Sequence, residues 1–466
     1  MEIQSDKNWG HPARYAVLGL LVLSGIAIAI AGAALHPAVV ETSRVLGSMG
    51  PVKALCIAAG GTVIFLLLVR YAEVALALFF LVGLIKGDPR LASAPVDLTV
   101  FTAVILLVGI AWRLLVWGKE LRLPREYFLY VPLLAVMIVS LSYAPNFVAG
   151  VVEVLRFICL TGIGIVAPFV LFDSTAKLRR FLYVLVLGGI GLSINSLTML
   201  GGGERFVSPS GLNTELGAAS AVAIIIVWGL VMPRLSFLWR MLYYPVLGVL
   251  VIALLGSGGR FATVSTVVCV LLGAVLCRPL LKDLAVMCCV AALALPLIWI
   301  PSASYNYLES LRNPSQAMGT REDLMALGIK LFEEHPLLGV GVDGFRWVSP
   351  NPITYNFPHN LILELGSEMG IVPALCFVLL AFFSFREAFR QIATRTVTDA
   401  AVVQTVLMLV IYGFLDSMIS GDINDLRFTW FVFALPFVLR NLRGGFFFRE
   451  VSTVESRQQL QPAPST

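Results

Sequence analysis

The feature that most constrains the fold is a long succession of apolar runs, each separated from the next by a short polar connection. Hydrophobic residues make up 58% of the chain and charged residues only 13%, whereas soluble domains are about one quarter charged. A bilayer core about 30 Å thick needs roughly 20 apolar residues per helix. Because lipid offers no partner to backbone polar groups, the spans must be helical. The sequence therefore predicts an all-α, polytopic transmembrane bundle.

The apolar runs also give the expected spans. They cover residues 14–34, 52–69, 71–86, 97–117, 127–143, 151–172, 180–200, 213–232, 241–256, 261–277, 284–300, 360–385, 400–420 and 428–440. The region 52–85 could instead hold one span and an interfacial piece. We therefore expect roughly 12 to 14 spans.

Positive charge predicts the orientation, because cytoplasmic loops carry an excess of Lys and Arg. About two thirds of the 33 Lys and Arg residues fall on the side of the two chain ends. We therefore expect a multi-pass membrane protein with cytoplasmic termini and with its large loop outside, in a periplasm-like or extracellular space. Its expected parts are transmembrane helices over 1–300, the large loop over 301–358, further transmembrane helices over 359–440 and a cytoplasmic, disordered tail over 441–466.

The large polar loop contains two recognisable local patterns. Residues 320–323 form a capping-box pattern, and Leu324, Leu327 and Leu331 then share one helical face. This predicts an amphipathic helix with Arg321 in its first turn. Residues 339–344 match the dinucleotide fingerprint G-x-G-x-x-G, but that motif needs a preceding strand and a βαβ unit. We interpret these residues as turn glycines.

Arginines recur where expected helices begin at the outer surface. Arg205 precedes the span 213–232, Arg260 opens 261–277, and His359 opens 360–385. Helix N-termini present free N–H groups and partial positive charge, so they attract anions. Arg205, Arg260 and Arg321 at such helix ends therefore suggest a binding site for a diphosphate. Alternatively, each arginine is an interfacial anchor or pairs with a nearby carboxylate. The same field would favour a neutral imidazole at His359, which could accept a proton.

Glu364 and Glu368 share one helix face below His359. They are expected either to pair with Arg260 or Arg321 or to face a polar cavity. The seven cysteines lie in or beside apolar runs, and no residue spacing is typical of a metal site. The sequence predicts neither a metal nor another cofactor.

The same motifs closely resemble those of the O-antigen ligase and polymerase family. The resemblance lies in residues 334–345 and in Pro358-His359-Asn360-Leu361, followed by Glu364, Glu368 and Gly370. Residues 256–260 look like the family's small-residue-plus-arginine motif, 320–321 like its second loop arginine, and 205–213 like its arginine-to-asparagine segment. The family often continues Gly-x-x-Gly, whereas this chain has Pro373 there, so the helix beyond Gly370 is expected to bend differently.

The resemblance implies a metal-independent, inverting glycosyltransferase. Its donor would be an undecaprenyl-diphosphate-linked glycan, and its acceptor a hydroxyl of lipid A core or of a growing polysaccharide at the periplasmic face. By the same resemblance, His359 would be the general base or the group that orients the acceptor hydroxyl, and Arg260 and Arg321 would stabilise the diphosphate. Residues that would help to bind substrate are Arg205, Asn360, Glu364 and Glu368. Membrane lipids are expected partners, and nucleic acid is not.

Three functions stay open at this point. Ligation of O-antigen to lipid A core and polymerisation of repeat units share the same donor chemistry and differ only in acceptor. A transporter of small anions such as bicarbonate is the alternative of another class. Transporters concentrate charge near the bilayer midplane and often show internal repeats. The polar residues of this chain gather near one surface instead, which favours the enzyme.

Overall fold

The structure is a computed structural model that describes residues 51–85, 98–119, 121–198, 206–209, 213–277, 280–299, 314–349, 357–394, 399–419 and 422–443. Within these ranges the regular elements are all helices, so the all-α prediction is confirmed. The expected first span, Arg205 and most of the expected C-terminal tail lie outside the described residues.

Eight helical stretches among the described residues are long and apolar enough to cross a membrane, as expected of a multi-pass membrane protein. They are α5 (Leu98–Leu115); η2 (Arg125–Leu129) with α6 (Tyr130–Ser140) and η3 (Leu141–Tyr143); α7 (Phe147–Arg156) with η4 (Phe157–Thr161) and α8 (Gly162–Leu171); α9 (Thr175–Leu197); α10 (Asn213–Ile226) with η5 (Val227–Val231) and η6 (Met232–Arg234); α11 (Phe237–Gly256); α18 (Ile371–Thr394); and α19 (Ala400–Ser417).

A ninth candidate span is broken. Helices α3 (Pro51–Arg70) and α4 (Ala72–Val82) meet at an angle of 107°. Arg113 is buried at this break, where it donates a hydrogen bond to the Arg70 carbonyl at 3.1 Å and pairs with Glu73 at 3.4 Å. Because the bend frees backbone carbonyls that lipid cannot satisfy, the guanidinium supplies the missing partner.

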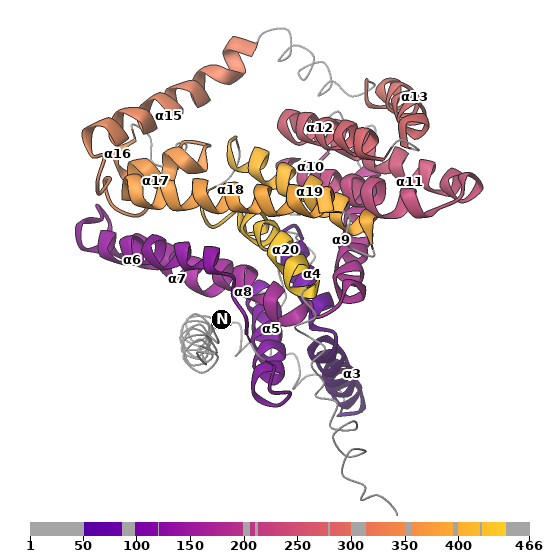
Figure 1. Cartoon of the computed structure of the whole chain (residues 1–466), viewed down its shortest axis with the longest axis horizontal. Helices are drawn as coiled ribbons and strands as arrows, with labels where there is room; N and C mark the ends of the chain where they lie inside the picture. The colour runs from indigo at the N-terminus through magenta and orange to yellow at the C-terminus, as the bar shows by residue number, and fades with distance from the viewer. Residues whose placement is uncertain are drawn as a thin grey trace, which may run out of the picture.

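The helices are arranged around α18 and α19, which lie alongside each other in the middle of Figure 1. Helices α10 and α12 (Arg260–Leu276) pack on α19, whereas α6 packs on α18. Helix α20 (Arg427–Arg443) contributes Trp430 and Phe431, which are fully buried among other aromatic rings such as Phe377 and Phe181. Helix α13 (Leu280–Trp299) packs on α11.

The expected single span 360–385 is wrong, because it is two helices. Helix α17 (Leu361–Met369) ends at Gly370, and α18 begins at Ile371. Gly370 has a φ of 81°, and a Cβ at this position would lie 2.1 Å from the Leu337 carbonyl oxygen. Only glycine fits this backbone. The chain therefore turns at Gly370.

The predicted start of the loop helix is also wrong. Helix α15 runs from Pro314 to Glu334, so Arg321 lies well inside it and not in its first turn. Proline suits the first helical position, because its fixed φ fits and its missing N–H has no intrahelical partner there. The pattern at 320–323 therefore continues a helix that has already begun.

The turn glycines between α15 and α17 are confirmed. Gly339 and Gly341 have φ values of 65° and 96°, and a Cβ on either would collide with backbone of another segment. The Val340 amide donates to the Ser367 carbonyl at 2.9 Å, and the Gly341 amide donates to the Glu368 carbonyl at 2.8 Å. The turn and the short helix α16 (Gly344–Val348) are thereby fixed against the end of α17.

Candidate functional site

The predicted loop arginine reaches the predicted histidine because α15 packs along α17. A Cβ on Gly328 would lie 3.3 Å from Pro358 and 3.6 Å from Leu363, so the two helices approach closely there. Arg321 lies two helical turns before Gly328, hence on the same face of α15. This face places the guanidinium near His359, and its charge acts on the imidazole.

His359 occupies an unusual backbone position. Its φ of 56° is in the left-handed region, which costs a residue with a side chain of order 1 to 3 kcal/mol and persists only where the surroundings fix it. The imidazole lies 4.5 Å from the Phe357 ring, and its buried Nδ1 has no hydrogen-bond partner. Burial, and secondly the charge of Arg321, lower the pKa of His359 to about 4. The lowered pKa agrees with the expected neutral imidazole, and burial is its main cause.

Arg260 is the first residue of α12, as predicted. The turn before it is tight. Gly258 has a φ of 67°, the Gly259 amide donates to Ser257 Oγ at 3.2 Å, and the Phe206 amide donates to the Gly256 carbonyl at 3.1 Å. The small residues of this motif thus let the segment after Arg205 pack directly against the turn that leads into Arg260.

The two arginines lie close enough to interact. Burial lowers the pKa of Arg321, and the charge of Arg260 lowers it further. Within the described ranges, Arg321 makes no ion pair. Two cations that repel each other are stabilised by an anion between them. Together with a neutral imidazole, the arrangement suits a bound phosphate group beside a proton acceptor.

Glu364 and Glu368 are almost fully buried, with exposures of 3% and 4%. Glu368 accepts hydrogen bonds from the amides of Asp343 at 3.0 Å and Phe345 at 3.2 Å. Glu364 accepts one from the Ile423 amide at 3.1 Å. Burial raises the pKa of both carboxyl groups. The expected pairing with Arg260 or Arg321 is not seen among the described residues, where both carboxyl groups accept hydrogen bonds from backbone amides instead.

Asn360 is the N-cap of α17. Its Oδ1 accepts a hydrogen bond from the Leu363 amide at 3.1 Å, and its Nδ2 donates to the Met418 carbonyl at 3.2 Å. Asparagine is favoured at this position because its side chain satisfies a free helix amide. The residue after the histidine therefore contacts backbone on both sides.

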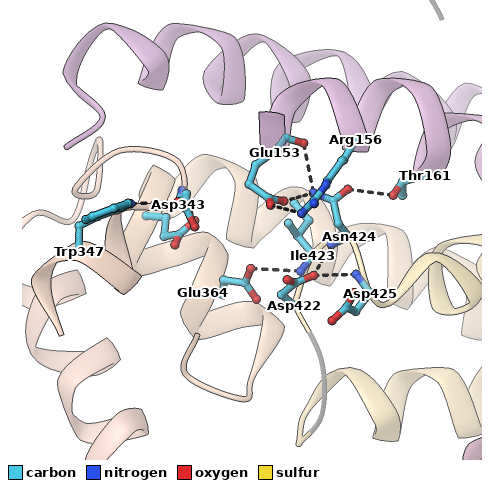
Figure 2. A network of polar contacts seen from close by, with 11 residues as sticks. Glu153, Arg156, Thr161, Asp343, Trp347, Glu364, Asp422, Ile423, Asn424 and Asp425 are labelled. Carbon is cyan, nitrogen blue, oxygen red and sulfur yellow. Dashed lines mark hydrogen bonds and ion pairs between the residues drawn. The ribbon is translucent and has the colours of Figure 1, made fainter. Parts of the chain in front are cut away.

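Residues 422–425 form a polar turn that contacts α17. The sequence did not connect this turn to the site. Figure 2 shows Glu364 directed at Ile423, and Asn424 next to Glu153. Asn424 also accepts a hydrogen bond from Thr161, which the π-helical segment η4 presents to it. The signal was present in the sequence Asp422-Ile423-Asn424-Asp425, because Asp and Asn accept bonds from the next amides in such turns.

Glu153 and Arg156 pair at 2.8 Å on α7, so the charge of the arginine is balanced locally. Among the described residues, no group of three or more His, Cys, Asp and Glu side chains is arranged to hold a metal ion. The carboxylates around the 422–425 turn are instead engaged with amides and Arg156. The acidic turn therefore joins α7 to α17.

Comparison with known proteins finds a match over the segment that contains most of the site. Residues 245–378 match the family model described as O-Antigen ligase, and this segment contains Arg260, Arg321 and His359, with Asn360. No curated protein matches the chain. This segment of the chain is therefore similar to the O-antigen ligase and polymerase family, which its sequence motifs also resemble.

Proposed function

We propose that this protein is a metal-independent, inverting glycosyltransferase that moves a glycan from undecaprenyl diphosphate to a hydroxyl of lipid A core. The family match supports transfer of a glycan. The finer proposal rests on one observation: the charge of Arg260 acts on Arg321, and the charge of Arg321 acts on His359. The three residues come from separate segments of the chain. The two cations suit the diphosphate of the donor, and the neutral imidazole suits the acceptor hydroxyl.

The reaction is a displacement at the anomeric carbon of the donor sugar. His359 accepts the proton of the acceptor hydroxyl, and the hydroxyl oxygen forms the new glycosidic bond. The bond between the anomeric carbon and the diphosphate oxygen breaks, and its electron pair goes to the diphosphate. Arg260 and Arg321 stabilise the negative charge that develops there. Attack from the side opposite the leaving group inverts the anomeric centre.

A neutral histidine is necessary for this assignment, and the structure supports it physically. An imidazole with an ordinary pKa near 6.5 would be partly protonated in mildly acidic surroundings and could not then accept a proton. Its burial beside Arg321 keeps His359 neutral well below pH 6. The arginines stay charged, since guanidinium groups are protonated throughout the physiological range.

We further propose that the site faces the periplasm of a bacterial inner membrane and that both chain ends are cytoplasmic. The excess of Lys and Arg on the side of the termini supports this orientation. In the same proposal, residues 301–358 form the periplasmic loop between the helices of 1–300 and 359–440. Arg205 is assigned to the donor phosphates with Arg260, on the strength of its place in the sequence motif.

Deletion of the gene tests this proposal, with lipopolysaccharide resolved on a gel and lipid-linked glycan measured in the same cells. A ligase predicts loss of all polymer on lipid A core and accumulation of polymer on the lipid carrier. A single repeat unit on core would show a polymerase instead. An unchanged glycan profile would exclude both the ligase and the polymerase activity. It would favour the alternative of an anion transporter. Complementation with the wild-type gene and with His359→Ala is the matched control, because only the first should restore polymer on core.

A further inference from the structure

The strained backbone at His359 needs an external support. A residue with a side chain keeps a φ of 56° only if its neighbours fix it. The imidazole itself gives little support, because its buried Nδ1 makes no hydrogen bond. The support must therefore come from the chain on either side of the histidine.

The next residue supplies two contacts. The side-chain oxygen of Asn360 binds the Leu363 amide and so fixes the first turn of α17. The side-chain nitrogen of the same amide binds the Met418 carbonyl, at the C-terminal end of α19. One side chain thus joins the residue after His359 to its own helix and to a second helix far along the chain.

A second contact fixes the same part of α17. Glu364 lies one turn after Asn360 and accepts a hydrogen bond from Ile423. Met418 and Ile423 both lie in the connection between α19 and α20. The first turn of α17 is therefore attached to that connection at two points, once through Asn360 and once through Glu364.

We propose that Asn360 is a positioning residue that holds the imidazole of His359 in its half-buried place beside Arg321, through its two backbone contacts with Leu363 and Met418. This inference rests on the proposed function for its catalytic meaning. It differs from a substrate-binding role, because backbone groups already occupy the oxygen of the amide and one of its N–H groups.

The protonation of His359 can be measured, and it depends on where the imidazole ring lies relative to Arg321. Arg321 is the charged group that acts on His359, and the Glu364 carboxylate accepts a hydrogen bond from the Ile423 amide instead. A ring released from this place moves into water and away from Arg321. Both changes favour the protonated form. The protonation of His359 therefore reports its position whether or not a substrate is present.

The experiment is an NMR titration of the full-length protein in lipid nanodiscs, with the histidine rings labelled with carbon-13. The chain has only four histidines, and the His359→Gln variant assigns the relevant signal. Wild-type His359 is expected to stay neutral from pH 7.5 to 5. In Asn360→Ala the signal should titrate within that window, near the ordinary value of about 6.5.

A second variant separates the two contacts of the amide. Asn360→Ser keeps a good helix cap but is too short to reach Met418, so it should fold with α17 intact and still shift the titration of His359. Asn146→Ala is the control, since Asn146 caps α7 through the Ala149 amide in the same way. It should leave the His359 signal unchanged.

Activity measurements complete the test. In a transfer assay, the Asn360 variants should lose activity as pH falls from 7.5 to 5.5, by about tenfold per pH unit below the new pKa, whereas the wild type should not. A His359 titration that is the same in wild type, Asn360→Ser and Asn360→Ala would overturn the inference. A wild-type protein with no transfer activity but a shifted titration in the variants would instead contradict the proposed function and leave the positioning role intact.

Discussion

Arg321 in α15 lies beside His359 at the entrance to α17, and its charge helps to keep the imidazole neutral. The same guanidinium is repelled by Arg260. In the proposed reaction, Arg321 therefore has two effects: it binds the anionic leaving group and it lowers the proton affinity of the base.

Removing the guanidinium should impair transfer severely. We expect Arg321→Ala to lower kcat by roughly 100- to 1,000-fold, as is typical when one preorganised donor to a developing anion is lost. Arg321→Lys should recover only part of the activity, because an ammonium group cannot bind two oxygens in parallel. Lys330→Ala on the same helix is the matched control, since Lys330 is exposed and only loosely paired with Glu334. Equal loss in both alanine variants would show a general effect on α15.

The pH dependence should reveal a base with a lowered pKa. His359 has a lower pKa in the folded protein than in the unfolded chain, so it stays neutral until the pH falls toward 4. We expect kcat/KM, which reports the free enzyme, to be nearly constant from pH 7.5 to 5. A decline centred near pH 6.5 would contradict the buried position of the imidazole. By linkage, this histidine destabilises the fold progressively as the pH falls from about 6.5 to 4.

The turn at Gly370 should tolerate no side chain. In Gly370→Ala the new Cβ would meet the Leu337 carbonyl and the left-handed backbone would be strained as well. Gly118→Ala is a close control, because Gly118 has a φ of 60° but open space around it. The control should lose only about 1 to 2 kcal/mol from strain. We expect a clearly larger fall in thermal midpoint for Gly370→Ala in detergent-purified protein, and similar midpoints would refute the close approach.

The carboxylate of Glu368 should hold the glycine turn in place. Glu368→Ala leaves the amides of Asp343 and Phe345 without their acceptor, at a cost of about 1 to 3 kcal/mol for each buried donor. We expect a lower thermal midpoint and faster protease cleavage within residues 339–345. Glu333→Ala provides the comparison, because Glu333 is exposed on α15. An unaltered cleavage pattern in Glu368→Ala would show that the turn is fixed by its glycines alone.

The sequence predicted the fold class and several elements of the site for physical reasons. Apolar runs of membrane length can form little other than helices, and the start of α12 at Arg260 follows from the glycines before it. The break at Gly370 was not predicted, because residues 360–385 form one apolar run in the sequence. Its cause is the approach of the Leu337 carbonyl, a contact between segments that local sequence does not encode.

The environment of the carboxylates could not be predicted for a similar reason. Glu364 and Glu368 share a helix face with the expected spacing, but helical spacing does not say which segment covers that face. The covering segments are the 422–425 turn and the glycine turn. Likewise, the capping pattern near Arg321 is a local signal that Pro314 overrides by starting the helix earlier. The direction of the His359 pKa was predictable, whereas its main cause, burial, required the fold.

The central claim is that His359 is the base of a metal-independent glycan transfer. It is tested most directly with purified protein in liposomes, an undecaprenyl-diphosphate-linked glycan, a lipid A core acceptor and EDTA. We predict that the wild-type protein transfers glycan at the same rate with and without EDTA, and that His359→Ala gives no product above background while still binding the donor. Near-normal transfer by His359→Ala would contradict this mechanism.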